Sequence, residues 1–314
     1  MLNSGAVESR GRLVVCFDFE GAYGMPYDLV YDLTRNTSLI LSELAQCDAR
    51  AVFFMVGRMV EDHPDVVQAI AAGGHEIGLH GYEHDDLSRY DTGALALFDK
   101  NLARVGSLVE DITGSRPQGF RAPYLLSPYF YRAEVYALLK AQGYRWVSNR
   151  QVRYPVELLR PGLFPIRSAW RGPDGAARLM ENRLLLPPLN TRLLIQESFG
   201  GSVLGRLRWL LGKRPPFIRD GLVEVPAYAP LDCDLLGLPT PQSDTPDDVL
   251  AFSRAVLQAA ARRQGGLSMV TFHDWIVSGG NRLVLLRDTL AAARENSMSI
   301  STIADNLDWL SAGV

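Results

Sequence analysis

Two histidines separated by three residues, His80 and His84, are the side chains of this sequence best suited to bind a metal ion. At this spacing two imidazoles can fall on one side of a helical turn. Two carboxylates, Asp18 and Glu20, come directly after an apolar run at residues 13–17. A carboxylate from a distant strand would complete a set of two histidines and one acid, which leaves coordination positions open for water and substrate. The combination predicts a hydrolytic metal site.

The histidine spacing alone does not separate a metal site from a structural role, because histidines satisfied by backbone carbonyls are common. Position in the chain favours the metal site. The pair follows a short apolar run at residues 76–79, and acids at the end of a buried strand are hard to explain as solvated surface. We interpret two other histidines, His63 before a proline and His75 at a strand start, as structural.

The elements that must position these residues alternate along the chain, since apolar strand-like runs are followed by amphipathic helical segments. We predict strands at 13–18, 51–56, 76–79, 119–121, 144–148, 222–226, 267–272 and 297–301. We predict helices at 36–46, 64–72, 92–112, 128–142, 245–263 and 281–295, with Ser127-Pro128 and Thr245-Pro246 as helix starts. Serial strands with intervening helices indicate a β/α barrel or a doubly wound sheet, and seven or eight strands favour the barrel.

Regularity fails between about residues 150 and 221, where Pro, Gly and Arg are frequent. We treat residues 1–314 as one domain with an irregular basic insertion at about 150–221. From Arg150 to Arg219 there are 13 Lys or Arg and four acids, a balance of +9, in a chain whose net charge is −3. Such segregation fits either an anionic partner or a solvated basic face. An amphipathic segment near 203–214 could lie on an anionic membrane surface, but we favour packing onto its own protein.

Composition indicates a soluble globular protein, with 47% hydrophobic and 21% charged residues. Three widely spaced cysteines give neither a disulfide framework nor a Cys-x-x-Cys motif, which favours a reducing compartment. The first residues show no cationic segment before a long apolar one, and apolar stretches fall short of the ~20 residues that span a bilayer. We therefore expect a cytoplasmic protein. No Gly-rich phosphate loop is evident, and we expect no nucleic-acid partner.

Polar residues end or follow four of the predicted strands. They are Asp18 and Glu20, His80 and His84, Arg121, and His273. In a β/α barrel the carboxyl ends of the strands meet at one mouth, so these side chains are expected to converge there.

These residues lie in four ordered motifs, FDFEG, HGYEH, FRAPY and TFHDW, through which the chain resembles the polysaccharide deacetylase family, carbohydrate esterase family 4, also called the NodB homology domain. The resemblance implies a distorted (β/α)7-type barrel and a metal-dependent N-deacetylase. The first motif departs from the usual adjacent aspartates, because Phe19 separates Asp18 from Glu20. That spacing resembles a variant branch of the family that acts on atypical substrates.

The resemblance also implies residue roles. It makes Glu20, His80 and His84 the metal ligands, Asp18 the general base, Arg121 the residue that keeps Asp18 ionised, and His273 the general acid. The backbone N–H near Tyr124 is a candidate to stabilise the oxyanion. Candidate substrate contacts are Tyr124, Pro123 and Trp275. The usual Asp-rich fourth motif, which orients the acid histidine, is not recognisable in YRWVSN, where Trp146 or Ser148 would take its place.

The leading hypothesis is a hydrolase that removes an N-acetyl or N-formyl group from an amino sugar. The charge pattern favours an anionic intracellular substrate, such as a phosphorylated, nucleotide-linked or polyprenyl-linked sugar, with peripheral contact at the inner membrane face. Zinc is the default metal, with Co²⁺, Ni²⁺, Fe²⁺ and Mn²⁺ as alternatives. Two other hypotheses stay open: an amidase acting on a non-sugar amide with the same metal site, and a non-catalytic carbohydrate-binding barrel.

Overall fold

The computed structural model describes residues 11–21, 32–125, 132–153, 217–229, 231–236, 239, 242–262 and 266–312. Its centre is a nine-stranded sheet in the order β6-β7-β5-β4-β3-β2-β1-β8, with β9 paired to β1. The strands are β1 (Arg12–Phe19), β2 (Val52–Met55), β3 (Glu76–Leu79), β4 (Gly119–Phe120), β5 (Trp146–Arg153), β6 (Phe217–Arg219), β7 (Leu222–Ala229), β8 (Leu267–His273) and β9 (Ser299–Ile300). Within these ranges every strand pair is parallel except β6 with β7.

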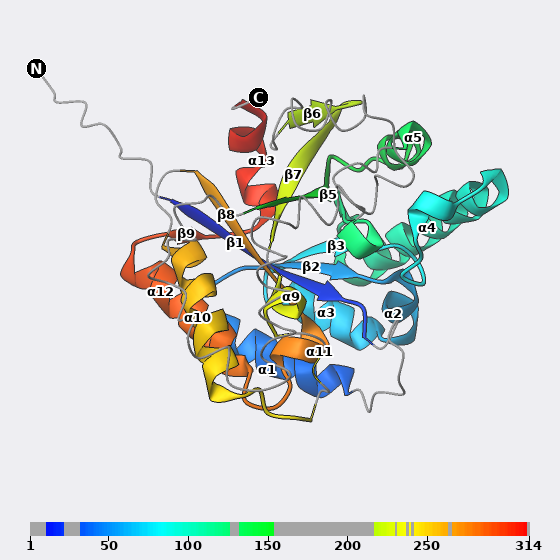
Figure 1. Cartoon of the computed structure of the whole chain (residues 1–314). Helices are drawn as coiled ribbons and strands as arrows, with labels where there is room; N and C mark the ends of the chain where they lie inside the picture. Colours follow the sequence, from blue (N-terminus) through cyan, green and yellow to red (C-terminus); the bar gives the residue numbers. More distant parts are fainter. Residues whose placement is uncertain are drawn as a thin grey trace, which may run out of the picture.

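The sheet curls into a half-barrel (Figure 1). β8 ends the sheet on one side and β7 lies next to its other end, and these two strands contact each other although no ladder joins their described residues. Seven strands, β1 to β5 with β7 and β8, form the parallel part of the wall. This α/β architecture confirms the predicted distorted (β/α)7-type barrel.

Helices surround the curled wall (Figure 1). They are α1 (Leu33–Gln46), α2 (Gly57–Asp62), α3 (Pro64–Ala72), α4 (Thr92–Thr113), α5 (Ala133–Ala141), α9 (Asp232–Leu236), α10 (Asp247–Ala261), α11 (Asp274–Val277), α12 (Leu283–Glu295) and α13 (Ile303–Ala312), with two short 3₁₀ turns, η1 (Leu87–Arg89) and η2 (Pro123–Leu125). Neighbours in the outer layer contact one another in the order α5, α4, α3, α1, α12 and α10.

Helix starts follow local capping chemistry, with one correction. Asp32 accepts a hydrogen bond from the backbone N–H of Arg35 at 2.9 Å and caps α1, and Asp91 caps α4 in the same way. Thr245 does not cap α10 as predicted. The N-cap residue of α10 is Pro246, and the backbone N–H of Thr245 donates instead to the side chain of Asn281 at 2.9 Å.

Side chains alternate across β1, as the two-residue period of a strand requires. Leu13, Val15, Phe17 and Phe19 join the large core beneath the outer helices. Val14 and Cys16 face the barrel interior, in a second core shared with Leu267, Met269 and α13. Asp18 and His273 are direct partners in the register of β1 with β8, so both continue this inward series at the carboxyl ends of their strands. Strand alternation therefore delivers both side chains to one mouth.

The interior is tight beside β4. A Cβ atom added at Gly119 would lie 1.9 Å from the ring of Trp146, which is fully buried. Only glycine leaves room for that indole. The position of β4, which carries Arg121 just beyond its end, therefore depends on this close contact.

Most predicted elements occur at or near their predicted positions, and α3 and β3 match the predicted ranges. Seven elements were missed: α2, α9, α11, α13, β6, η1 and η2. β5 was predicted to end at residue 148, but it continues to Arg153 and pairs with β7 over residues that we assigned to the insertion. The predicted helix start at Ser127-Pro128 lies outside the described residues.

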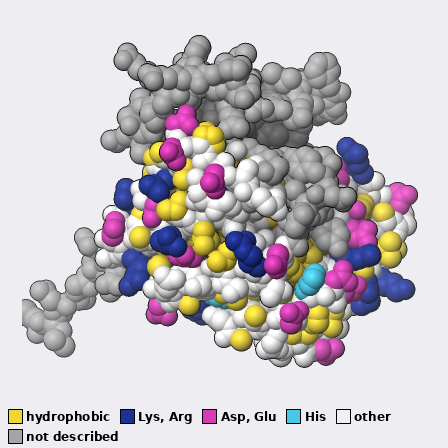
Figure 2. Space-filling view, turned by 90° about the horizontal axis from the view of Figure 1, so that it is seen from below, with side chains coloured by type: hydrophobic (Ala, Val, Ile, Leu, Met, Phe, Trp, Pro, Cys, Tyr) yellow, Lys and Arg dark blue, Asp and Glu magenta, His cyan; other side chains and the backbone are white. Residues whose placement is uncertain are grey.

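The predicted basic insertion is described only at its two ends, which form the end of β5 and the β6–β7 hairpin. Residues 154–216, including the amphipathic segment, lie outside the described residues. Figure 2 shows one face of the molecule, on which Lys and Arg side chains lie among Asp and Glu side chains. Among the described helices, none combines the length and the apolar character that crossing a membrane requires.

Candidate metal centre and active site

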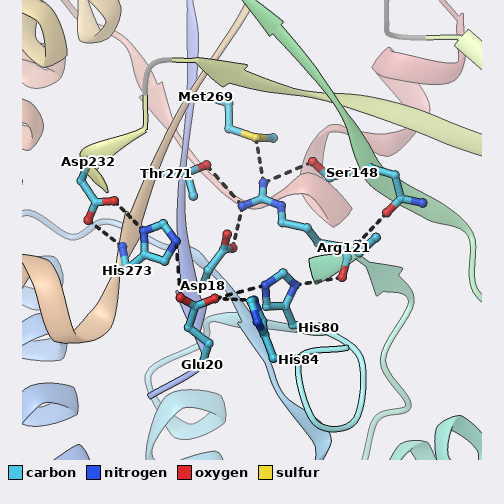
Figure 3. Close-up of polar contacts among 12 residues, drawn as sticks. Asp18, Glu20, His80, His84, Arg121, Ser148, Asp232, Met269, Thr271 and His273 are labelled. Atoms are coloured by element: carbon cyan, nitrogen blue, oxygen red, sulfur yellow. Dashed lines mark hydrogen bonds and ion pairs between the residues drawn. The ribbon is translucent and has the colours of Figure 1, made fainter. Parts of the chain in front are cut away.

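Three buried side chains converge where β1 and β3 end (Figure 3). Glu20 follows β1 and His80 follows β3, while His84 lies four residues further along the loop. Glu20 Oε2 lies 2.7 Å from His84 Nε2 and 3.6 Å from His80 Nε2. One ligand atom from each residue lies within 4.8 Å of the other two. The structure thus brings together all three predicted metal ligands.

The donor set fits a divalent transition metal. His80 Nδ1 lies 2.9 Å from the backbone carbonyl of Arg121, which can only accept a hydrogen bond. This contact assigns the proton to Nδ1 and directs the lone pair of Nε2 toward Glu20. Two imidazole nitrogens and one carboxylate form an open site of the kind that zinc and its first-row neighbours occupy in hydrolases.

The spacing of the two histidines had suggested that they share a helical turn, but they do not. His80 follows β3, and residues 82–84 form a bend. Gly81 has φ +75°, and His84 itself has φ 58°. A left-handed conformation costs a non-glycine residue about 1 kcal/mol or more. Backbone strain at a proposed metal ligand is therefore part of the geometry that directs His84 back toward Glu20.

Glu20 is held as a carboxylate. Burial by itself raises the pKa of Glu20, but the charge of His273 and the hydrogen bonds to His80 and His84 outweigh burial and hold the pKa well below its usual range. The backbone on either side is fixed as well, because the buried carboxylate of Asp274 accepts hydrogen bonds from the N–H groups of Glu20 and Gly21. The ligand is thus ionised and positioned.

Asp18 and Arg121 form a buried ion pair beside the metal centre. Arg121 Nη1 donates to Asp18 Oδ1 at 2.7 Å, and Arg121 is fully buried. The guanidinium also donates to Thr271 Oγ1 at 3.3 Å and to Ser148 Oγ at 3.2 Å, and it stacks 4.0 Å from the centre of the Phe54 ring. These contacts fix the plane of the guanidinium, which in turn compensates the buried charge of Asp18.

A second polar network holds the backbone next to Arg121 from the outer face of the sheet. Asn149 Oδ1 accepts a hydrogen bond from the backbone N–H of Ala122 at 2.8 Å. The backbone N–H of Asn149 donates to Glu224 Oε1 at 2.9 Å, and Tyr136 donates to Glu224 Oε2 at 2.7 Å. All four residues are buried. The network therefore fixes the peptide that links Arg121 to Ala122, whose carbonyl contacts His80.

His273 is oriented by Asp232, a residue that the sequence reasoning missed. Asp232 Oδ1 lies 2.6 Å from His273 Nδ1, and Asp232 Oδ2 accepts the backbone N–H of His273 at 2.7 Å. His273 Nε2 then faces the metal centre, 3.7 Å from Glu20 Oε1. Burial lowers the pKa of His273, but the charges of Asp232 and Glu20 prevail and raise it to about 10. The imidazole is therefore set as an imidazolium with a proton available on Nε2.

The two residues considered for the missing fourth motif have other roles. Trp146 is a buried core residue whose Nε1 donates to Glu76 at 3.1 Å, and Ser148 contacts Arg121. The residue that orients the predicted acid, His273, is Asp232 in the segment Leu231-Asp-Cys-Asp234, shortly after the predicted strand at 222–226. The sequence did contain a signal for Asp232, because a carboxylate shortly after a predicted strand is the same pattern that identified Asp18 as a site residue.

The three predicted substrate contacts differ in exposure. Tyr124 is 60% exposed, has φ 62°, and its ring lies edge-on to His84 with centroids 4.6 Å apart. Pro123 is buried, and Trp275 is fully buried with its ring 6.5 Å from that of His273. Of the three, Tyr124 is thus placed to meet a substrate directly. The other two can act on it only through the residues that they support.

Comparisons with known proteins find similarity to deacetylases. Residues 11–147 match the family model described as Polysaccharide deacetylase. A peptidoglycan-N-acetylglucosamine deacetylase of Bacillus cereus is 33% identical over 90 residues, 29% of this chain and 32% of its own length. A chitooligosaccharide deacetylase of Rhizobium leguminosarum bv. trifolii is 38% identical over 84 residues, 26% of this chain and 39% of its own. The chain thus spans about a third of these relatives.

Solved structures extend the likeness of fold to the whole chain. A protein of Mycobacterium smegmatis classed as a polysaccharide deacetylase aligns over 99% of this chain and 93% of its own, with a TM-score of 0.55 at 17% identity. A pseudoenzyme of carbohydrate esterase family 4 from Bacillus anthracis aligns over 96% of this chain and 66% of its own, with a TM-score of 0.50 at 12% identity. At these identities the likeness concerns the fold.

Proposed function

We propose that the chain is a member of the polysaccharide deacetylase family, whose model matches residues 11–147, and that it is a metal-dependent hydrolase that removes an N-acetyl or N-formyl group from an amino sugar. One observation carries the proposal. The metal-binding set of Glu20, His80 and His84 lies between a paired carboxylate and a paired histidine, each buried and each oriented by its own partner. A structural metal site would need neither pair.

The geometry gives each residue a task in amide hydrolysis. A divalent ion held by Glu20, His80 and His84 would lower the pKa of a bound water and polarise the substrate carbonyl. Asp18 accepts the proton of the attacking water, and Arg121 keeps that carboxylate in place. His273 donates its Nε2 proton to the nitrogen of the breaking C–N bond, so that the amine leaves neutral and the acyl group leaves as a carboxylate.

Tyr124 is the proposed substrate contact at the mouth of the barrel. Tyr124 has a left-handed backbone and lies against His84, and we assign its N–H group to the developing oxyanion; its exposed ring offers an apolar face to a sugar. The names of the two bacterial relatives support an N-acetylated amino sugar as the substrate class.

The finer substrate assignment is an anionic intracellular amino sugar, phosphorylated or linked to a nucleotide or a polyprenyl carrier. Its support is the +9 balance between Arg150 and Arg219. If it holds, KM for a phosphorylated N-acyl sugar rises between low and high salt, and rises again when Arg206, Arg208, Lys213 and Arg214 are replaced by Gln. An unchanged KM in both experiments would leave a neutral sugar as the substrate.

Metal analysis joined to acyl release tests the proposed function. The zinc-loaded protein is incubated with free and phosphorylated N-acetyl and N-formyl sugars and with non-sugar amides, and acetate and formate are measured. We expect release from sugars, and loss of both metal and activity in His84→Ala. His63→Ala, a histidine at the start of α3 outside the site, is the matched control. Release only from non-sugar amides would identify an amidase of other substrates, and bound metal without any release would identify a non-catalytic barrel.

A further inference from the structure

The described residues contain a second group of side chains with the donors of a metal site, on the far side of His273 from the metal centre. Asp232, Cys233 and His273 each offer a ligand atom, and these atoms lie within 4.8 Å of one another. We propose that this group binds a second zinc ion through the Cys233 thiolate, and that this ion inhibits the enzyme by capturing His273. The inhibition rests on the proposed function, whereas the binding does not.

Two of the three ligand atoms need little rearrangement. Asp232 Oδ1 and His273 Nδ1 lie 2.6 Å apart, a hydrogen-bond distance. Tetrahedral coordination with bonds of about 2.0 Å to oxygen and nitrogen would place these two atoms about 3.3 Å apart. The pair therefore opens by less than about 1 Å to admit the ion. Asp232 stays anchored meanwhile, because its Oδ2 accepts the backbone N–H of His273 at 2.7 Å.

The surroundings favour a cation, and the sulfur favours a soft one. Burial, together with the carboxylates of Asp234, Asp232, Glu20 and Asp18, raises the pKa of the Cys233 thiol well above its usual value, so the thiol is neutral in the empty site and releases its proton to solvent when the ion binds. A divalent ion at the thiol would be attracted by each of them. Thiolate ligands select zinc and similar soft ions over magnesium or manganese, so this site discriminates among metals more strongly than the all-nitrogen and oxygen centre beside it.

Binding there would stop proton donation. The ion displaces the Nδ1 proton of His273 to solvent and breaks the hydrogen bond to Asp232. The remaining Nε2–H belongs to a metal-bound imidazole, which is a weaker acid than an imidazolium. With a general acid worth about 100-fold or more in rate, a filled second site should reduce turnover by about that factor. Zinc would then activate at one equivalent and inhibit in excess.

Cobalt titration of the full chain separates the two sites, because Glu20, His80 and His84 include no sulfur. We expect a second equivalent of Co²⁺ to produce a thiolate-to-cobalt charge-transfer absorption in the near ultraviolet. Cys233→Ser and Cys233→Ala should both lose this absorption and the second equivalent. Cys47→Ser, which removes another partly buried free cysteine, should keep both. Absence of the absorption in the unaltered protein, or its persistence in both Cys233 variants, would refute the site.

Activity then tests the inhibition separately. Excess zinc should slow acyl release by about 100-fold in the unaltered protein and in Cys47→Ser, and much less in Cys233→Ser, whose rate at one equivalent should be unchanged. Equal inhibition in Cys233→Ser would overturn the inhibitory role. If no substrate were hydrolysed at all, the proposed function would fail, while the cobalt titration would still decide whether the second site exists.

Discussion

The negative charge of Asp232, and not only its position, determines the protonation state of His273. Asn in place of Asp232 can keep a contact to Nδ1 but removes the negative charge that stabilises the imidazolium. We expect Asp232→Asn to lower kcat by about 100-fold. Because the pKa of His273 is raised to about 10 chiefly by Asp232, its loss should also move the alkaline limb of the pH–rate profile to lower pH.

Metal content serves as the control in that experiment, since Asp232 is not among the proposed ligands of the first site. We therefore expect Asp232→Asn to have a reduced kcat but still to bind one equivalent of zinc. A profile whose alkaline limb stays in place would show that Asp232 does not set the charge of His273.

Arg121 stabilises the fold as well as having a proposed role at the active site, because it is the counter-charge of the buried Asp18. Arg121→Ala would leave Asp18 buried without a counter-charge, and we expect it to lower the free energy of unfolding by about 3–5 kcal/mol. Urea denaturation of the protein measures this. The control is Arg58→Ala, whose ion pair with Glu83 has side chains 48% and 46% exposed and should be worth less than about 1 kcal/mol. Similar losses in both variants would contradict the burial argument.

At the level of elements, β4 and β5 are held together beyond their short ladder. Register pairs end at Phe120 with Val147, and two side chains then continue the connection. Inside the barrel, Ser148 accepts a hydrogen bond from the guanidinium of Arg121. On the outer face, Asn149 accepts one from the backbone N–H of Ala122. Two adjacent residues of β5 thus fix two adjacent residues after β4, one on each face of the sheet.

Removing the outer contact should weaken the metal centre from a distance. Asn149→Ala leaves the buried N–H of Ala122 without its acceptor, which costs about 1–3 kcal/mol of stability. The shift of the neighbouring carbonyl away from His80 should lower zinc affinity by about 10-fold or more. Competition with a chelating dye measures the affinity. Asn101→Ala, on the exposed side of α4, should leave it unchanged, and equal affinity in both variants would show that the network serves stability alone.

For the whole molecule, His75 makes stability depend on pH. Burial, with the nearby charge of Arg50, lowers the pKa of His75 to about 4, and its Nδ1 accepts the backbone N–H of Ala51 at 3.3 Å. The folded state therefore favours the neutral ring. The stability contributed by this preference is complete above the ordinary pKa of about 6.5 and is lost as the pH falls toward 4.

We expect that loss to amount to about 1–2 kcal/mol for this partly exposed ring. His75→Gln keeps an acceptor but cannot titrate, so the free energy of unfolding of this variant should fall less between pH 7 and pH 4 than that of the unaltered protein. Urea denaturation at several pH values checks this. Parallel pH curves for the two proteins would show that another group is responsible.

The site residues that could be predicted from the sequence are those marked by local patterns. Asp18 ends one apolar run and His80 follows another, so the carboxyl ends of the strands place both at one mouth, and His84 lies only four residues beyond His80. Asp232 was missed because it follows β7, beyond a long irregular stretch, in a helix of only five residues. The contact between Tyr136 and Glu224 joins positions 88 apart, and a single sequence does not distinguish such buried polar residues from surface ones.

The position of β1 has a consequence for the order in which the protein assembles. β1 lies between β2 and β8, and Asp18 pairs in register with His273, 255 positions later in the chain. The proposed metal ligands all belong to the first part of the sequence, so an ion could bind during synthesis, while the proposed acid, His273, arrives only after nearly the whole chain has emerged. Closing so long a loop is entropically costly and slow. A nascent chain could therefore hold its metal well before it can hydrolyse anything.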